Sequence, residues 1–293
     1  MTPQEKEDLK RISRVMRAAR KISGKNQVEI SKALGISQSA LSKFESGLLI
    51  PSTSQWFMFC KVVGIDSLET FTYGVVDNAR PARLDGTYPA SSFKIPKKYS
   101  HHAGSKVRAI RPFLQYFEER LGTEKMENYI EAQKIDQDYF VVYDNQLNIG
   151  FTLDMLTSLI GSGDLTAKDI PELTHVLNQP VIHGSLSHGY QRSSNQIQLI
   201  NDLVHHSEHY EINFDYKIED MNQKSLDLSI KPHEHMELFE YRSSHLGNFL
   251  CQYKKSYLER FSTYNGGKPV EIEESECHYK GAEQCLYQVK LAG

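Results

Sequence analysis

The sequence contains no run of eighteen apolar residues, the length that a membrane-spanning helix needs. It begins with charged residues and has no hydrophobic segment like that of a secretory signal. Its four cysteines are too few for the disulfide framework of a secreted protein, so we expect reduced thiols or metal ligands. These absences predict a cytoplasmic protein that does not enter a membrane.

The sequence signatures of common enzyme classes are also missing. There is no G-x-S-x-G motif, no P-loop, no G-x-G-x-x-G motif, and no cysteine–histidine pair in a recognisable frame. Residues 205–209 and 233–235 place histidines at spacings that resemble metal sites, but no H-E-x-x-H or C-x-x-C motif accompanies them. We therefore expect no enzymatic activity, and an enzyme in the C-terminal half is the least favoured alternative.

Charge is distributed unevenly along the 293 residues. Residues 1–50 contain ten Lys and Arg and five Asp and Glu, a balance of +5, whereas the whole chain carries −3 and the remainder therefore about −8. The length predicts two domains, and 39% hydrophobic residues are enough for each to bury a core. A basic head on an acidic body confines electrostatic attraction for DNA to the head.

Residues 27–47 predict two short helices joined at Gly35. Gly35 can take the positive φ that ends a helix, and Ser37 is placed to cap the next one. Apolar residues at helical spacing give each helix a buried face: Val28, Ile30, Ala33 and Leu34 on the first, Leu41 and Phe44 on the second.

The second of these helices carries short polar side chains on its outer face. They are Gln38, Ser39, Ser42 and Lys43. A helix equipped in this way can enter the major groove and hydrogen-bond to base edges, so we predict that the chain binds double-stranded DNA. The alternative is an ordinary helical hairpin whose polar face is only solvated.

The same segment, from Gln27 through Ser37-Gln38-Ser39 to Glu45-Ser46-Gly47 with Pro51-Ser52 following, resembles the Cro/C1-type (XRE-like) helix-turn-helix transcription regulators over residues 8–72. The resemblance implies that Gln27 opens the first helix of the motif against a phosphate. It implies that Gln38, Ser39 and Lys43 face base edges, and that Arg20 pairs with Glu45 near the DNA backbone.

Basic side chains also precede the motif, in a pattern that suits either a solvated helix face or contact with phosphates. They are Lys10, Arg11, Arg14, Arg17, Arg20, Lys21 and Lys25. We expect phosphate contact from Lys25 and Arg20 in particular.

Composition divides the chain into an all-α DNA-binding domain (residues 1–75), a linker or extended arm (residues 76–104) and an α+β domain (residues 105–293). Three prolines and small polar residues mark the linker. In the last domain, helical spacing predicts helices over residues 107–121, 125–133, 152–160, 169–177 and 235–261. Alternation predicts two antiparallel hairpins, from residues 210–218 with 225–230 and from 269–276 with 284–291.

Three cysteines and a glutamate form the second informative pattern. The last hairpin brings Cys277 and Cys285 together, Glu274 lies three residues upstream, and Cys251 lies in the long helix. Three thiolates and one carboxylate form a closed tetrahedral set for a structural Zn²⁺. The alternative is reduced core thiols, the role we expect for Cys60. The carboxylate is the weakest member, because other groups lie near enough to replace it: Glu273, Glu276 and His278.

This ending, over residues 208–291, resembles the 4-vinyl-reductase-type small-molecule sensor domain of phenol-responsive bacterial activators. In that family one helix cysteine, one glutamate and two hairpin cysteines bind zinc, which implies that Cys251, Glu274, Cys277 and Cys285 do so here. The sequence departs from that family because no ATPase domain follows and a Cro/C1-type head precedes. The Tyr-x-Ser-x-Arg signature of haem–nitric oxide proteins is absent.

Together, these patterns predict a one-component transcription regulator. Its C-terminal domain is expected to dimerise and to sense a small apolar or aromatic ligand. The alternative is a dimeric DNA-binding scaffold whose C-terminal domain only binds protein partners.

Overall fold

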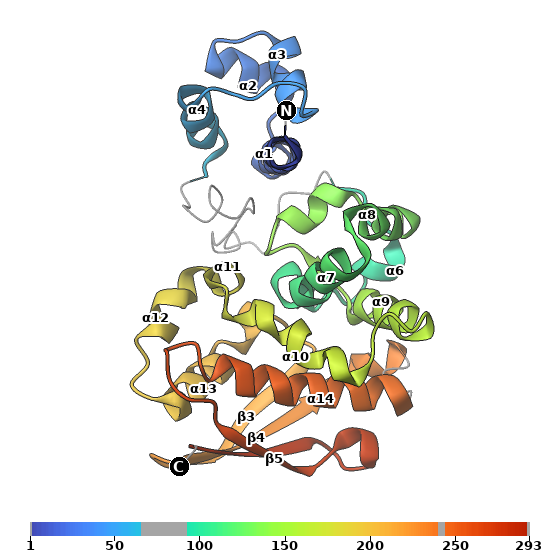
Figure 1. Ribbon diagram of the computed structural model, residues 1–293, viewed down its shortest axis with the longest axis vertical. Coiled ribbons are helices and arrows are strands. Elements are labelled where there is room, and N and C mark those ends of the chain that lie inside the picture. The colour runs from blue at the N-terminus through green and yellow to red at the C-terminus, as the bar shows by residue number, and fades with distance from the viewer. Residues whose placement is uncertain (1, 66–92, 240–243, 292–293) are drawn as a thin grey trace. The chain divides into compact units, whose positions relative to one another are not determined.

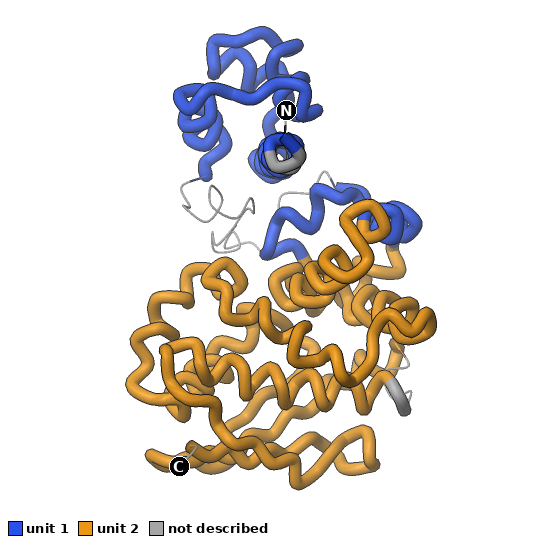
Figure 2. Tube along the Cα trace, viewed as in Figure 1, with its two compact units in different colours: residues 1–96, 127–145 blue, residues 97–126, 146–293 orange. Residues whose placement is uncertain are grey.

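The computed structural model describes residues 2–65, 93–239 and 244–291 (Figure 1). They form two compact units (Figure 2): unit 1 contains residues 1–96 and 127–145, and unit 2 contains residues 97–126 and 146–293. As predicted, the chain combines a helical N-terminal region with a C-terminal domain of helices and an antiparallel sheet. Within the described ranges, no helix is long and apolar enough to span a bilayer.

Unit 1 is built from helices with well-formed ends. They are α1 (Pro3–Ser23), α2 (Gln27–Leu34), α3 (Gln38–Glu45), α4 (Thr53–Val63), the end of α8 (Thr123–Ala132) and the 3-10 helix η1 (Gln137–Val141). Gly35 ends α2 at φ 65°, and the Ser37 hydroxyl accepts the Ala40 N–H at 3.1 Å to cap α3. Both local predictions are confirmed.

The side chains that α2 buries are not all those that the sequence predicted. Ile30 is fully buried, but Val28 is 57% exposed and Ala33 is also exposed. Ser31 is buried instead, with its hydroxyl bonded to the Val28 carbonyl. The predicted apolar face was therefore wrong at two positions, because an eight-residue helix makes barely two turns and fixes its buried side only through its neighbours.

Unit 2 contains a four-stranded antiparallel sheet in the order β3-β4-β6-β5. The strands are β3 (Phe214–Met221), β4 (Ser225–Pro232), β5 (Glu271–Glu276) and β6 (Cys285–Lys290). Both predicted hairpins are present, and the central pairing of β4 with β6 joins them, with Ile230 opposite Cys285. On one face of these two central strands the side chains are buried. Leu228 and Tyr287, which lie opposite each other on this face, are both 0% exposed. The helix α14 (Ser244–Phe261) packs against β5 and lies along the sheet (Figure 1).

Shorter elements complete unit 2. They are α6 (Lys97–Ser100), β1 (Ser105–Lys106), α7 (Val107–Leu121), the start of α8, β2 (Gln146–Leu147), α9 (Ile149–Gly161), η2 (Ala167–Asp169), α10 (Ile170–Leu173), η3 (Thr174–Asn178), α11 (Pro180–His183), η4 (Gly184–Leu186), α12 (Ser187–Gln191), α13 (Gln196–His205), η5 (Ser207–His209), η6 (Glu234–Phe239) and η7 (His278–Lys280). The α7 limits agree with the prediction. The single helix predicted over residues 235–261 is instead η6 followed by α14, and residues 240–243 lie outside the described ranges.

The two units do not follow the predicted domain limits, since residues 127–145 cluster with the N-terminal helices. Most of the predicted linker, residues 76–92, lies outside the described residues. Its remaining part, residues 93–104, contains α6 and two buried aromatic side chains, Phe93 and Tyr99, so this part is packed and not extended. Large aromatic side chains within a proline-containing segment are the feature of the sequence that indicates this packing.

Candidate functional site

The outer face of α3 presents the predicted base-reading side chains to solvent. Gln38, Ser39, Ser42 and Lys43 are all exposed. The opposite face is anchored, because Leu41 is 0% and Phe44 3% exposed. A helix held by one face and exposed along the other meets the geometric requirement for insertion into a groove.

Glu45, the last residue of α3, forms hydrogen bonds with two of the predicted phosphate-contacting residues, Arg20 and Gln27. Its carboxylate is buried and accepts two hydrogen bonds from Arg20, from Nε at 2.6 Å and from Nη2 at 3.0 Å. Gln27 donates to the same carboxylate at 2.8 Å. The expected Arg20–Glu45 pair is thus present. Arg20 and Gln27 are half-buried and hold α1 and α2 to α3, whereas Lys25 is exposed.

Much of the remaining positive charge of α1 is balanced inside unit 1. Lys10 lies 2.5 Å from the Glu127 carboxylate, and Arg14 pairs with the same group. Arg17 forms two hydrogen bonds of 2.8 Å with the buried Asp138, whose neighbour Asp136 pairs with Lys21. Because these carboxylates neutralise one side of α1, the cationic surface available to DNA is smaller than the charge count of residues 1–50 suggested.

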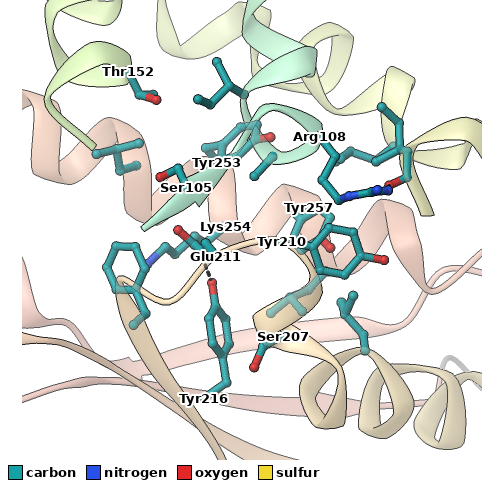
Figure 3. Close-up of a pocket in the computed structure, with 18 of the residues that line it drawn as sticks. Ser105, Arg108, Thr152, Ser207, Tyr210, Glu211, Tyr216, Tyr253, Lys254 and Tyr257 are labelled. Atoms are coloured by element: carbon teal, nitrogen blue, oxygen red, sulfur yellow. Dashed lines mark hydrogen bonds between the residues drawn. The ribbon is translucent and has the colours of Figure 1, made fainter. Parts of the chain in front are cut away.

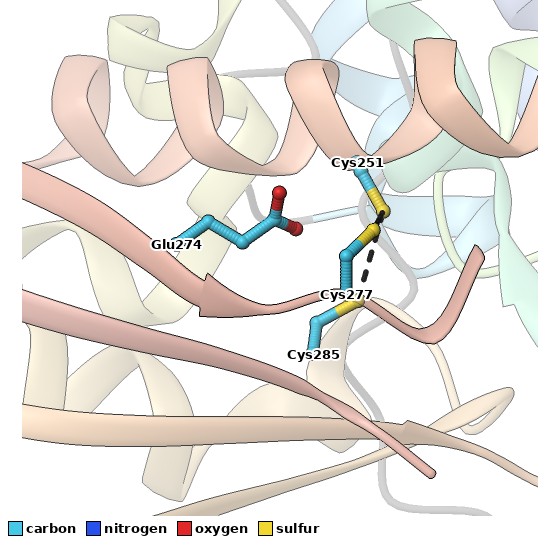
Figure 4. Close-up of side chains that lie close together, drawn as sticks. All are labelled: Cys251, Glu274, Cys277 and Cys285. Carbon is cyan, nitrogen blue, oxygen red and sulfur yellow. Dashed lines mark hydrogen bonds between the residues drawn. The ribbon is translucent and has the colours of Figure 1, made fainter. Parts of the chain in front are cut away.

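In unit 2 the four predicted metal ligands converge (Figure 4). Cys251 comes from α14, Glu274 from β5, Cys277 directly follows β5, and Cys285 is the first residue of β6. One ligand atom from each lies within 4.8 Å of all the others. The Cys251 sulfur is 3.4 Å from that of Cys277 and 3.6 Å from that of Cys285. Thiolates about 2.3 Å from a tetrahedral Zn²⁺ are about 3.8 Å apart, so the arrangement fits zinc.

The surroundings of the cluster suit a metal bound by thiolates. The Cys285 sulfur accepts hydrogen bonds from the Cys251 thiol and, at 3.4 Å, from the His278 N–H; these bonds lower the pKa of Cys285 to about 6 although burial opposes the shift. In the described chain, the buried Oε1 of Glu274 has no hydrogen-bond partner. A buried acceptor without a donor is costly, and a cation in the cluster would remove that cost.

The alternative carboxylates are less well placed than Glu274. Glu273 and Glu276 are exposed, whereas Glu274 points at the sulfurs (Figure 4). His278 is buried and its Nδ1 is shared between the main-chain carbonyls of residues 282 and 283, at 3.1 and 3.0 Å, but neither of its ring nitrogens belongs to the set of ligand atoms that lie within 4.8 Å of one another. The geometry therefore selects Glu274 among the groups that the spacing left open.

Beside this cluster, the α14 backbone lies very close to an aromatic ring of the β5–β6 hairpin. Gly247 on α14 faces the Tyr279 ring, and a Cβ added there would lie 1.9 Å from a ring carbon. Only glycine at this position lets η7, which separates Cys277 from Cys285, reach α14.

A cavity of about 100 Å³ lies between α7, α14, β3 and the segment around η5 (Figure 3). Much of its wall is apolar, with side chains such as Ile110, Phe113, Leu250 and Leu258. Ionisable groups also line it: Arg108, Glu211, Lys254 and several tyrosines. Sequence reasoning missed this site, because its residues come from separate elements and each has an ordinary place on its own helix or strand.

The polar groups of the cavity differ in how they are held. Arg108 is fully buried and donates to the Ile182 carbonyl at 2.8 Å. Glu211 accepts a hydrogen bond of 2.6 Å from Tyr216. The Lys254 ammonium lies 2.9 Å from the centroid of the Phe214 ring, and burial lowers its pKa. Burial, with the nearby Glu211 carboxylate, raises the pKa of Tyr216 well above its usual range, so the phenol stays protonated.

Comparison with known proteins places the N-terminal motif in a family. Residues 16–69 match the family model of the helix-turn-helix. No curated protein matches the chain. Similar solved structures include the Fe(II) unliganded H-NOX protein of K. algicida, at 13% identity over 64% of this chain and 97% of that one, with a TM-score of 0.43. They also include the H-NOX protein of S. oneidensis in the Fe(II)NO state, at 11% identity over 64% and 99% of the two chains, with a TM-score of 0.46.

Proposed function

We propose that this protein is a DNA-binding transcription regulator whose C-terminal domain senses a small organic molecule and contains a structural zinc ion. The exposed polar face of α3, within a segment that matches the helix-turn-helix family, is the observation that carries the proposal. Gln38, Ser39, Ser42 and Lys43 would read base edges in the major groove. Lys25 would contact phosphate, while Arg20 and Gln27 would position the motif and approach the backbone.

Zinc would be structural because the protein supplies all four ligands. Three cysteine sulfurs and the Glu274 carboxylate complete a tetrahedral shell, which leaves no position for an activated water. The ligands come from α14 and from the last hairpin, so the ion would join the helix to the sheet. This closed shell, and the absence of enzyme motifs from the sequence, support a protein without catalytic activity.

Sensing is assigned to the cavity of unit 2. Its mostly apolar wall suits an apolar or aromatic molecule. Histidine and cysteine are the usual axial ligands of haem iron, and neither lines the cavity in the part of the chain that the structure describes. An organic ligand is therefore favoured. It can regulate DNA binding only if it binds the competent and incompetent states with different affinity.

We further propose that the protein acts as a homodimer. A single helix-turn-helix covers one half-site, and specificity normally comes from two-fold pairs on a pseudo-palindrome. Unit 1 exposes large apolar side chains on α4 and just before it, which a protein surface would cover: Leu48, Leu49, Ile50, Phe57 and Met58. The same side chains favour the second candidate, a DNA-binding scaffold that recruits protein partners.

Selection of duplexes from a random library with the full-length protein tests the proposal. We expect an enriched sequence with two related half-sites. The double variant Ser39→Ala/Ser42→Ala should change the enriched bases, whereas the exposed α4 substitution Lys61→Ala should not. Equal recovery of all sequences by the parent protein would reject the regulator. Analytical ultracentrifugation at micromolar concentration tests the dimer, and a monomer that binds one half-site tightly would exclude it.

A further inference from the structure

The cavity of unit 2 holds one ammonium group that forms no ion pair within the described residues, although the Glu211 carboxylate and the Cys251 and Cys285 sulfurs lie near enough to favour its charged form. Lys254 is half-buried and borders the cavity, and within the described ranges its Nζ makes no hydrogen bond and no ion pair. Its ammonium lies over the Phe214 ring, a contact that stabilises the charge only in part. Buried cations are normally paired with an anion, because they lose hydration without compensation.

The carboxylate in the cavity wall does not fill that role. Glu211 lines the same cavity, but its carboxylate accepts the Tyr216 hydroxyl at 2.6 Å and forms no ion pair with Lys254 (Figure 3). Arg108 adds a second fixed cation to the wall. Because Lys254 forms no ion pair with that carboxylate, a ligand with one negative charge would supply the anion that a buried ammonium normally pairs with.

The remaining wall limits the size and shape of that ligand. The cavity of about 100 Å³ is on the scale of the engineered cavity of about 150 Å³ that holds benzene. Phe113 and Tyr253 form a ring pair with centroids 4.7 Å apart, and both border the cavity together with Phe214. Flat aromatic surfaces beside aliphatic side chains suit a single aromatic ring.

We propose that this cavity binds a small aromatic monocarboxylate whose carboxylate pairs with Lys254 and whose ring lies against the apolar wall. The inference rests on the proposed sensing function and names its ligand class. The Tyr253 and Tyr257 hydroxyls, which stay protonated because burial raises their pKa, supply neutral donors along the wall.

Calorimetry of the full-length protein with benzoate, and with benzyl alcohol as a neutral probe of similar size, tests the charge preference. We expect benzoate to bind at least tenfold more tightly than benzyl alcohol. Lys254→Met keeps the length and apolar stem of the side chain and should remove that preference. Lys255→Met is the matched control, because Lys255 is next on α14, pairs with Glu259 and does not border the cavity.

Three outcomes would overturn the inference: equal binding of both probes to the parent, an unchanged benzoate preference in Lys254→Met, or no binding of either probe. DNA binding is scored separately in the library selection. If benzyl alcohol binds better and alters DNA binding, the proposal of a transcription regulator is supported and the proposal of an anionic ligand is rejected. If benzoate binds through Lys254 and no duplex is selected, the proposal of an aromatic carboxylate ligand is supported and the proposal of a transcription regulator is rejected.

Discussion

Unit 1 carries its candidate binding groups on the outside of one short helix, whereas unit 2 gathers its own in the interior. Gln38 and Lys43 are exposed side chains on α3, and the Gln38 side chain is held only by a long hydrogen bond of 3.5 Å to Gln27. Cys251 and Cys285 are buried and come from a helix and a strand far apart in the chain. A surface site of the first kind can be changed without affecting stability, whereas in the second kind binding and folding share the same residues.

Loss of zinc should produce the largest difference in stability between the two units. We expect Cys277→Ser to lose one zinc per chain and to unfold unit 2 while the helices of unit 1 persist, because metal binding supplies folding free energy of about 10 kcal/mol or more in small zinc domains. Cys60→Ser is the control, since that half-buried thiol lies on α4. Elemental analysis and thermal unfolding measure both effects. Zinc-free protein from a chelator-free purification, or equal metal loss from Cys60→Ser, would contradict the assignment.

Acid should also affect the two units differently, because all twelve histidines lie outside residues 1–96 and 127–145. His183 is fully buried between the Leu177 carbonyl and the Tyr210 hydroxyl, and burial lowers its pKa to about 4. The unfolded chain takes up this proton near pH 6.5 and the folded chain only near pH 4. The free energy of unfolding should therefore fall between these values, by about 3 kcal/mol.

Chemical denaturation across that pH range measures this loss. His183→Phe should reduce the pH dependence even though it lowers stability at every pH, whereas the exposed His188→Gln should keep the parent slope. Identical slopes for the parent and His183→Phe would show that this histidine does not hold a depressed pKa in the folded protein.

Local chemistry explains which parts of the fold were predictable. Gly35 and Ser37 act on their own neighbours, so the end of α2 and the start of α3 followed from residue type. Alternation likewise identified both hairpins. The break between η6 and α14 was not predictable, because helical spacing of apolar residues continues across residues 235–261 and tertiary packing decides where the helix starts.

The same distinction separates the two candidate sites of unit 2. Cysteine is rare in this chain, so three thiols at hairpin and helix positions were enough to identify the cluster from residue type and spacing. The cavity gave no such signal. Lys254 and Arg108 look like ordinary charged positions on amphipathic helices, and only the packing of α7 against α14 and the sheet shows that they face an interior space. Side chains of common type reveal a site only through their neighbours in space.

On α3 we expect a change in binding without a change in stability. Gln38→Ala should cost about 1–3 kcal/mol of affinity for the selected duplex and relax its sequence preference, because an amide that reads a base edge is lost. The melting temperature should stay that of the parent, since Gln38 is exposed. Fluorescence anisotropy with specific and random duplexes measures the difference. Unchanged binding to both would show that α3 does not lie in the groove.

The smallest effect is expected at Lys25, which is exposed just before α2 and has no role in the Glu45 network. If it contacts one phosphate, Lys25→Ala should weaken binding to specific and random duplexes by the same factor. The slope of log affinity against log salt should also decrease by about 0.9, the value for one released counterion. Lys10→Ala is the matched control, because Lys10 already pairs with Glu127 and should leave the slope unchanged. A larger change in slope for Lys10→Ala than for Lys25→Ala would mean that the carboxylates of residues 127–138 leave α1 when DNA binds, and would reverse the assignment of the phosphate-contacting surface.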